Sequence, residues 1–152
     1  FRRVLFRSAE TVVEMDGKRW CLTGDIGYMD EHGRVYISDR KKQLIKYKGY
    51  SVYPKEIEEL VGGNNAVLEV AVAGLPDHET GEKIKAWVVL RSEWQGKLSV
   101  EELHEWCRKN MTHYKVPSYI EFIDELPKTL VGKVMRRTLQ ENDPLFKKYH
   151  GA

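Results

Sequence analysis

The chain has 152 residues, of which 41% are hydrophobic and 32% are charged, and its formal net charge is +2. This length fits one domain, or one domain with a short piece of a neighbour, and it allows a sizeable hydrophobic core. So balanced a charge does not require a nucleic acid or a membrane surface as a partner. No apolar run approaches the roughly 20 residues that a membrane span needs.

The cysteines and the start of the chain indicate a location and a boundary. Cys21 and Cys107 have neither the spacing of a disulfide framework nor that of a metal site, which favours a reducing, cytoplasmic location. The chain opens on Phe1, and residues 1–8 are a short basic and apolar stretch. We interpret the chain as a fragment, and residues 1–8 as a strand remnant or a foreign leader rather than a targeting peptide.

The first part of the chain predicts a small hairpin followed by a charged junction. Residues 19–22 and 35–38 have strand character, with a turn at 30–33 between them. A cationic run from Arg40 to Lys42 then marks a candidate domain boundary at residues 39–42. Residues 43–48 alternate as a strand does, and Gly49 ends that strand.

The remaining sequence alternates between helical and strand patterns. Pro54 suits the first turn of a helix, and Ser99 with Glu102 forms a capping-box pattern at the start of another. Helices are expected at 54–62, 99–110 and 135–141, and strands at 66–75, 83–91 and 119–123. This order predicts an α+β domain in which helices pack on a mixed three-stranded sheet.

Two candidate site residues are ambiguous when they are read alone. Asp25 is either an exposed acid in a turn or an acceptor for vicinal hydroxyl groups such as those of a ribose. Lys133 follows Gly132, but a phosphate-binding loop needs glycine where Pro127 stands and Ser or Thr where Val134 stands. The local pattern therefore makes Lys133 a solvent-exposed loop lysine.

Basic residues interleaved with tyrosines form one candidate anion-binding patch. Its members are Arg40, Lys41, Lys42, Lys46, Lys48, Tyr47, Tyr50 and Tyr53. The patch is compatible with a solvated strand face, with nucleic acid, or with a nucleotide or other polyphosphate. The histidines are scattered, and His104 with Cys107 supplies too few ligands, so no metal site is predicted.

Three strings occur in a fixed order along the chain. They are Thr23-Gly24-Asp25-Ile26-Gly27-Tyr28, then residues 39–50 with Pro54, Glu56, Ile57 and Glu58, and finally Leu126-Pro127-Lys128-Thr129 with Gly132-Lys133. Together they resemble the late motifs of the adenylate-forming enzymes, a family that includes acyl-CoA synthetases, aryl-CoA ligases, firefly luciferase and the adenylation domains of peptide synthetases. The resemblance spans residues 9–140.

The resemblance implies a division into two domains. Members of this family have a large N-terminal domain, a hinge and a small C-terminal domain. Residues 1–39 would then be the tail of the large domain, with the hinge at Asp39, and residues 40–152 would be the mobile C-terminal domain.

The resemblance also implies the first half of a reaction. A carboxylate attacks the α-phosphate of ATP to give an acyl-adenylate, and Lys133 matches the family lysine that neutralises the charge developing between them. Asp25 and Arg40 would hold the ribose hydroxyls. Mg²⁺ is expected with ATP, with its ligands mainly outside this chain.

The second half would transfer the acyl group to the thiol of CoA. Lys46 matches a family lysine of the thioester-forming conformation, and Lys48, Gly49 and Tyr50 would line the path of CoA. The absence of a side chain at Gly49 would let the pantetheine arm pass close to the backbone. Arg108 matches a position that contacts a CoA phosphate in some relatives.

These resemblances favour a fragment of an ATP-dependent acid:CoA ligase that is inactive without its large domain. Its partners would be a carboxylic acid, ATP, CoA and that domain. Ser51 stands where many relatives carry Gln or Arg, which leaves a contact to the adenylate open. One alternative is an adenylation domain that loads a carrier protein, and another is a basic nucleic-acid-binding module. The acid is not specified, because its pocket would belong to the large domain.

Overall fold

The computed structural model describes residues 11–151, so the expected leader at residues 1–8 lies outside the described residues. The chain divides into two compact units, residues 1–42 and 43–152. The division falls at the end of the predicted boundary, between Lys42 and Gln43. Assignment of the first unit to the tail of a larger domain stays a prediction.

The first unit contains two separate antiparallel hairpins. Strand β1 (Val12–Met15) pairs with β2 (Lys18–Cys21), and β3 (Asp25–Met29) pairs with β4 (Val35–Arg40). The predicted pairing of residues 19–22 with 35–38 is wrong. Asp16 and Gly17, with φ of 52° and 68°, make the tight turn that sends β2 back along β1 instead.

The turn between β3 and β4 is organised by one carboxylate. Asp30 accepts hydrogen bonds from the backbone N–H groups of His32 and Arg34, from the Arg34 side chain and from the hydroxyl of Tyr36. The bond from the Arg34 backbone contributes most to lowering the pKa of Asp30. The turn predicted at residues 30–33 is confirmed.

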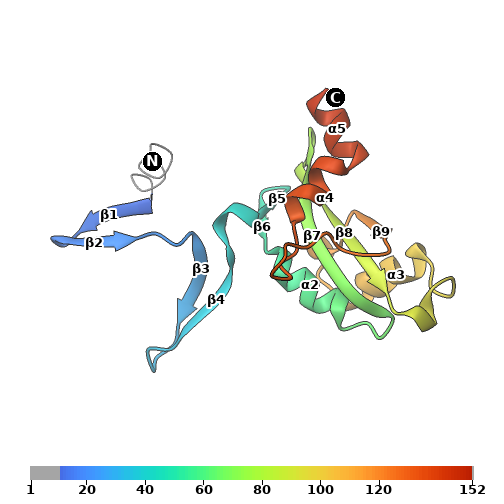
Figure 1. Cartoon of the computed structure of the whole chain (residues 1–152), viewed down its shortest axis with the longest axis horizontal. Coiled ribbons are helices and arrows are strands. Elements are labelled where there is room, and N and C mark those ends of the chain that lie inside the picture. Colours follow the sequence, from blue (N-terminus) through green and yellow to red (C-terminus); the bar gives the residue numbers. More distant parts are fainter. Residues whose placement is uncertain (1–10, 152) are drawn as a thin grey trace. The chain divides into compact units, whose positions relative to one another are not determined.

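The second unit is built on a five-stranded mixed sheet (Figure 1). Its strands are β5 (Ile45–Tyr47), β6 (Tyr50–Val52), β7 (Val67–Asp77), β8 (Gly81–Leu90) and β9 (Tyr119–Phe122). The order is β6-β5-β8-β7, and β9 also pairs with β8, in parallel. Because β7 occupies one edge of β8 along its length, β5 and β9 share the other edge.

The α+β class and the mixed sheet are confirmed, but the predicted count of three strands is wrong. The strand expected at residues 43–48 is present as β5, and it joins the sheet together with β6, with which it forms a hairpin. The hairpin joins the sheet through one registered pair, Tyr47 with Gly81. A contact between residues so far apart in the sequence leaves no local pattern.

Helices cover both faces of this sheet. The helices are α2 (Pro54–Gly62), α3 (Val100–Asn110), α4 (Arg136–Asn142) and α5 (Pro144–His150), with 3-10 turns η1 (Lys41–Gln43), η2 (Ser92–Trp94) and η3 (His113–Lys115). Alternate residues of β8 face two separate cores, because side chains alternate along a strand. Ile84, Ala86 and Val88 pack with α2 and α3, whereas Trp87 and Val89 pack with Leu139 of α4 and Phe146 of α5.

Local signals account for the positions of several helix ends. The capping box of α3 is present, with Ser99 accepting from the Glu102 N–H and Glu102 accepting from the Ser99 N–H. Helix α5 was not predicted; Asp143 caps it by accepting from the Leu145 N–H, and Pro144 occupies its first turn. No helix within residues 11–151 is long and apolar enough to cross a membrane.

Candidate functional site

The predicted ribose-binding residues lie side by side in the first unit. Asp25 and Arg40 are register partners across β3 and β4, and Arg40 Nε lies 3.3 Å from Asp25 Oδ1. The Lys41 N–H donates to the carbonyl of Gly24, which holds the preceding turn against the end of β4. The arrangement presents a partly exposed carboxylate next to a guanidinium, both able to bind hydroxyl groups.

The predicted hinge residue is buried within this unit. Asp39 is 8% exposed, and its carboxylate accepts the backbone N–H of Arg40 at 2.7 Å. Asp39 therefore constrains the residue at which the chain leaves β4. Its hinge role stays a prediction.

The Lys46 hairpin, defined as residues 45–52, carries four of the predicted site residues in the second unit. Tyr47 pairs with Tyr50, so Lys48 and Gly49 form a two-residue loop. Their φ angles of 48° and 82° are those of a tight turn whose twist matches the paired strands. This geometry alone requires a residue such as glycine at position 49.

The turn geometry therefore explains why position 49 is a glycine, an explanation that the sequence alone did not provide. A Cβ built on Gly49 meets no described atom within 4 Å, so its own fold leaves space there. The proposal that this space serves the pantetheine arm stays untested. The turn itself would be strained by an ordinary side chain because of the positive φ.

Lys46 is exposed but its ammonium has a defined partner. Lys46 Nζ donates to Ser51 Oγ at 2.6 Å, directly across the hairpin. Ser51, which stands where many relatives were expected to carry Gln or Arg, thus orients Lys46 in this structure. Lys48 Nζ lies 5.5 Å from the centre of the Tyr47 ring, a cation–π contact at the turn.

Tyr114 contacts the Lys46 hairpin through Tyr50 and was not found from the sequence. Its ring stacks on that of Tyr50, with centroids 4.5 Å apart and planes inclined by 11°. Tyr114 belongs to η3, and the next residue, Lys115, pairs with Glu56 of α2 and lies over the Tyr114 ring. Position alone gave no signal for Tyr114, because 64 residues separate it from Tyr50.

The Lys133 hairpin, defined as residues 128–134, is a separate and smaller structure. Lys128 and Val134 form an isolated antiparallel bridge. The carbonyl of Thr129 accepts a hydrogen bond from the Gly132 N–H, and the Thr129 hydroxyl accepts one from the Lys133 N–H. Leu130 and Val131 at its tip are 108% and 88% exposed. The ammonium of Lys133 has no hydrogen-bond or ion-pair partner among residues 11–151.

Ion pairs anchor both stems of the Lys133 hairpin. On the entering side Lys128 Nζ lies 2.5 Å from Glu69 Oε1 of β7. On the leaving side Arg136 makes a two-pronged contact with Glu58 of α2, whose carboxylate also accepts the Val72 N–H. The backbone of Lys133 is therefore tied at both sides, while its ammonium is unpaired among residues 11–151.

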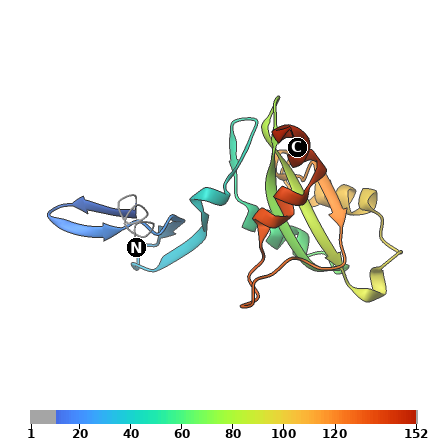
Figure 2. The same cartoon turned by 45° about the horizontal axis from the view of Figure 1, so that its top comes forward.

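The two lysine hairpins are anchored toward opposite ends of β7. The entering stem of the Lys133 hairpin is tied to Glu69 near the start of β7, and its leaving stem is tied through Glu58 to Val72 in the middle. The Lys46 hairpin pairs beside Asp77, at the turn into β8. Eight positions along a strand correspond to roughly 26 Å. Figure 2 shows the β5–β6 hairpin beside the β7–β8 turn and the loop before α4 toward the other end of these strands.

Arg108 is not brought to either hairpin by a described contact. It is an exposed residue of the last turn of α3, where cations suit the helix dipole. Cys107, the residue before Arg108 in that helix, is buried in the core, and burial raises the pKa of its thiol to about 11. Among the described residues no cluster of three His, Cys, Asp or Glu side chains is arranged to hold a metal ion.

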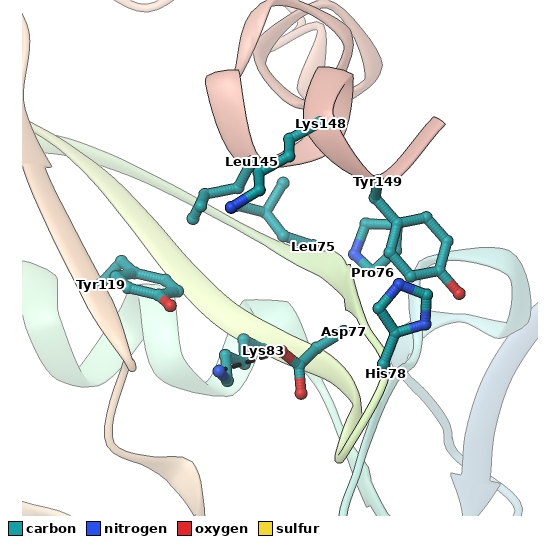
Figure 3. Close-up of a pocket in the computed structure, with 9 residues that line it drawn as sticks. All are labelled: Leu75, Pro76, Asp77, His78, Lys83, Tyr119, Leu145, Lys148 and Tyr149. Carbon is teal, nitrogen blue, oxygen red and sulfur yellow. Dashed lines mark ion pairs between the residues drawn. The ribbon is translucent and has the colours of Figure 1, made fainter. Parts of the chain in front are cut away.

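A cavity of about 240 Å³ lies between the β7–β8 turn, Tyr119 and α5 (Figure 3). None of the predicted site residues lines it. Its Asp77 and Lys83 neutralise each other at 2.9 Å, and His78 stacks on Tyr149. A hydrogen bond from Thr80 holds the pKa of Asp77 well below its usual range.

Known proteins resemble this chain across most of its length. A long-chain-fatty-acid–CoA ligase of Bacillus subtilis (strain 168) is 49% identical over 124 residues, which are 82% of this chain and 22% of that protein. ATP-bound MatB from Rhodopseudomonas palustris superposes with a TM-score of 0.82 at 31% identity, covering 95% of this chain and 28% of that one.

A third comparison is the o-succinylbenzoate CoA synthetase MenE from Bacillus subtilis, in complex with its acyl-adenylate OSB-AMP. It gives a TM-score of 0.72 at 32% identity, over 86% of this chain and 26% of that one. The chain thus spans about a quarter of the length of these relatives.

The family model for the AMP-binding enzyme C-terminal domain matches residues 56–133 of this chain. This range includes Arg108 and the loop up to Lys133. These residues run from α2 through β7, β8, α3 and β9, so they contain three of the five strands of the second unit's sheet. They are also more than half of the 152 residues. The chain therefore belongs to the AMP-binding enzyme C-terminal domain family.

Proposed function

We propose that this chain is the C-terminal part of an ATP-dependent acid:CoA ligase. The observation that carries the proposal is the presence of two exposed lysine hairpins, anchored toward opposite ends of β7 in one compact unit. A small domain that carries a different lysine hairpin toward each end suits a reaction whose two half-reactions need different groups at the same active site. The names of the relatives favour CoA over a carrier protein as the acceptor.

In the first half-reaction Lys133 serves the activation of the acid. The carboxylate and the α-phosphate of ATP repel each other, and an ammonium between them neutralises the charge that develops as pyrophosphate leaves. Lys133 suits this role because its ammonium is unpaired among the described residues and its backbone is anchored. Mg²⁺ accompanies ATP in this proposal, with its ligands mainly outside this chain.

In the second half-reaction the Lys46 hairpin serves thioester formation. The sulfur of CoA attacks the carbonyl carbon of the acyl-adenylate, and AMP leaves. Lys46, Lys48, Gly49 and Tyr50 are all exposed residues of the hairpin formed by β5 and β6. Tyr114 supports that hairpin through its stack on Tyr50. Arg108 remains a proposed contact for a CoA phosphate.

The first unit suits the tail of a larger domain. Most of its large apolar side chains are half or more exposed: Met15, Trp20, Leu22, Tyr28, Met29, Val35 and Ile37. Isolated two-stranded hairpins are marginally stable in water and need a surface to pack on. We assign residues 1–39 to that domain, with Asp25 and Arg40 on the ribose and Asp39 as the hinge.

The proposal is tested on a full-length protein that contains this chain, supplied with ATP, Mg²⁺ and a panel of carboxylic acids. Acid-dependent release of pyrophosphate, followed by AMP release and thioester formation on adding CoA, is expected. Long-chain fatty acids head the panel because of the name of the Bacillus subtilis relative. Transfer to a carrier protein but not to CoA would replace the proposal with the carrier-loading alternative. Salt-sensitive oligonucleotide binding without any adenylation would favour the nucleic-acid module.

A further inference from the structure

The backbone of Lys46 is held by a side chain from another strand. The Lys46 N–H donates to Oε2 of Glu82 at 2.6 Å. Glu82 is the second residue of β8, and 36 positions separate it from Lys46 in the sequence. A hydrogen bond from a backbone N–H to a carboxylate is stronger than one to a neutral acceptor.

This contact compensates for weak pairing between β5 and the sheet. The ladder between β5 and β8 has one registered pair, Tyr47 with Gly81, followed by a bond from the Lys48 N–H to the carbonyl of Thr80. Before that pair, the Glu82 carboxylate takes the position of a backbone acceptor for Lys46. Glu82 therefore adds a contact to an attachment that otherwise consists of this pair, the Lys48 bond and the burial of Ile45 and Val52 in the core.

Gly74 of β7 provides the space that the Glu82 carboxylate occupies. A Cβ on Gly74 would lie 2.6 Å from Glu82 Oε1 and 3.1 Å from Ile45 Cγ2. Gly74 is paired with Ile84 and has an ordinary negative φ, so its turn geometry does not explain the glycine. The glycine is explained instead by the close approach of the Glu82 carboxylate and of Ile45 in β5, which leaves no room for a Cβ.

We propose that Glu82, seated against Gly74, is a positioning residue that places the Lys46 hairpin for thioester formation. The inference rests on the proposed function of that hairpin. Glu82 acts through the backbone of Lys46 and takes no part in the adenylation half-reaction, whose lysine is anchored at Glu69 and Glu58 instead.

The first test measures the contact itself, independently of activity. Hydrogen exchange of the Lys46 amide is followed by NMR in the full-length protein and in three variants. Glu82→Ala and Gly74→Ala should each raise the exchange rate about 10-fold or more, because a charge-assisted hydrogen bond is lost. Glu82→Gln retains an acceptor and should restore most of the protection. The matched control is Glu79→Ala, which removes an exposed carboxylate from the turn between β7 and β8. It should leave the exchange rate of the Lys46 amide unchanged.

The second test separates the two half-reactions. Glu82→Ala should slow thioester formation from preformed acyl-adenylate about 10-fold, raise the KM for CoA, and leave acid-dependent pyrophosphate release at the wild-type rate. Glu82→Gln should recover most of the lost rate. The double variant Gly74→Ala/Glu82→Ala should be only slightly slower than Glu82→Ala, because both changes remove the carboxylate contact and the new Cβ adds only a close approach to Ile45 Cγ2.

The proposal is overturned if Glu82→Ala forms thioester normally, or if both half-reactions fall equally. A wild-type protein that forms adenylate but never thioester would overturn the proposed function and the positioning role with it. Lys46 exchange would still decide whether the contact exists. Unchanged Lys46 exchange in both Glu82→Ala and Gly74→Ala, with thioester formation intact in the wild type, would overturn the contact and the positioning role but leave the proposed function standing.

Discussion

The two lysine hairpins of the second unit differ in which part of the lysine is held. In the Lys46 hairpin the ammonium bonds to Ser51, the backbone bonds to Glu82 and the turn is fixed by two residues with positive φ. In the Lys133 hairpin the backbone is tied by ion pairs at both stems, and the ammonium is unpaired among residues 11–151.

This difference suggests different demands on the two lysines. An ammonium that must reach charge developing on a substrate in another domain gains from being unpaired, because no internal bond has to be broken first. The Lys46 hairpin, which is proposed to line the path of CoA, gains instead from a fixed backbone. The variants below test whether each hairpin depends on the feature that distinguishes it.

The largest effect is expected for Lys133→Ala. Loss of the ammonium should slow acid-dependent pyrophosphate release by roughly 10²- to 10³-fold, as for other groups that stabilise developing charge. Thioester formation from supplied acyl-adenylate should stay near the wild-type rate. Lys128→Ala, which removes the neighbouring lysine that pairs with Glu69, is the control and should have a much smaller effect. Equal loss in both half-reactions would contradict the separation of roles.

The next effect is expected for Arg136→Ala at the leaving stem of the Lys133 hairpin. Within residues 11–151, this change leaves the largely buried Glu58 carboxylate with only the Val72 N–H as a donor. The free energy of unfolding should fall by about 2 kcal/mol, measured by urea denaturation, and adenylation should slow while thioester formation persists. Arg137→Ala, whose exposed partner is Glu141 on the same helix, should lower stability far less. Unaltered adenylation would show that this stem does not position Lys133.

A smaller effect on stability separates the two reasons for Gly49. Gly49→Ala should lower the free energy of unfolding by about 1 kcal/mol because its φ of 82° strains an L-residue. Gly49→Asn should lower it less, since asparagine tolerates this conformation. If the CoA path also needs the missing side chain, both variants lose thioester formation. Normal thioester rates in Gly49→Asn would leave the turn as the sole reason for the glycine.

The smallest effect is expected for Ser51→Ala, which frees the Lys46 ammonium. The site is exposed, so stability should change by less than about 0.5 kcal/mol. Thioester formation should slow by a factor of about two, because Lys46 must then be oriented by the substrate. Ser51→Thr retains the hydroxyl and should behave as wild type in the same assay. A larger loss with Ser51→Thr than with Ser51→Ala would rule out an orienting hydroxyl.

Features encoded by neighbouring residues were predictable. The capping box at Ser99 and Glu102, the helix from Pro54 to Gly62 and the apolar strands on either side of the 77–81 turn all depend on contacts within a few positions. The α5 helix was missed although its start carries two local signals, the Asp143 cap and Pro144 in the first turn. The first hairpins were mispaired because strand character does not specify a partner.

The candidate site divides in the same way. The motifs around Asp25, Lys46 and Lys133 are short strings and could be read directly, whereas Tyr114, Glu82 and Gly74 act through contacts with residues 64, 36 and 29 positions away. Such partners carry no shared periodicity with the residues they touch. Their importance is visible only when the strands are paired.

The sequence by itself determined the α+β class, the resemblance to the adenylate-forming family and the residues proposed to serve each half-reaction. These depend on local propensity and on ordered strings of residues, which persist in the unfolded chain. Tertiary structure alone decided that β5 and β6 join the sheet beside Gly81, that Glu82 holds Lys46 and that the two lysine hairpins are anchored toward opposite ends of β7. Long-range pairing decides these features because a backbone N–H or an ion pair finds its partner only after the chain has folded.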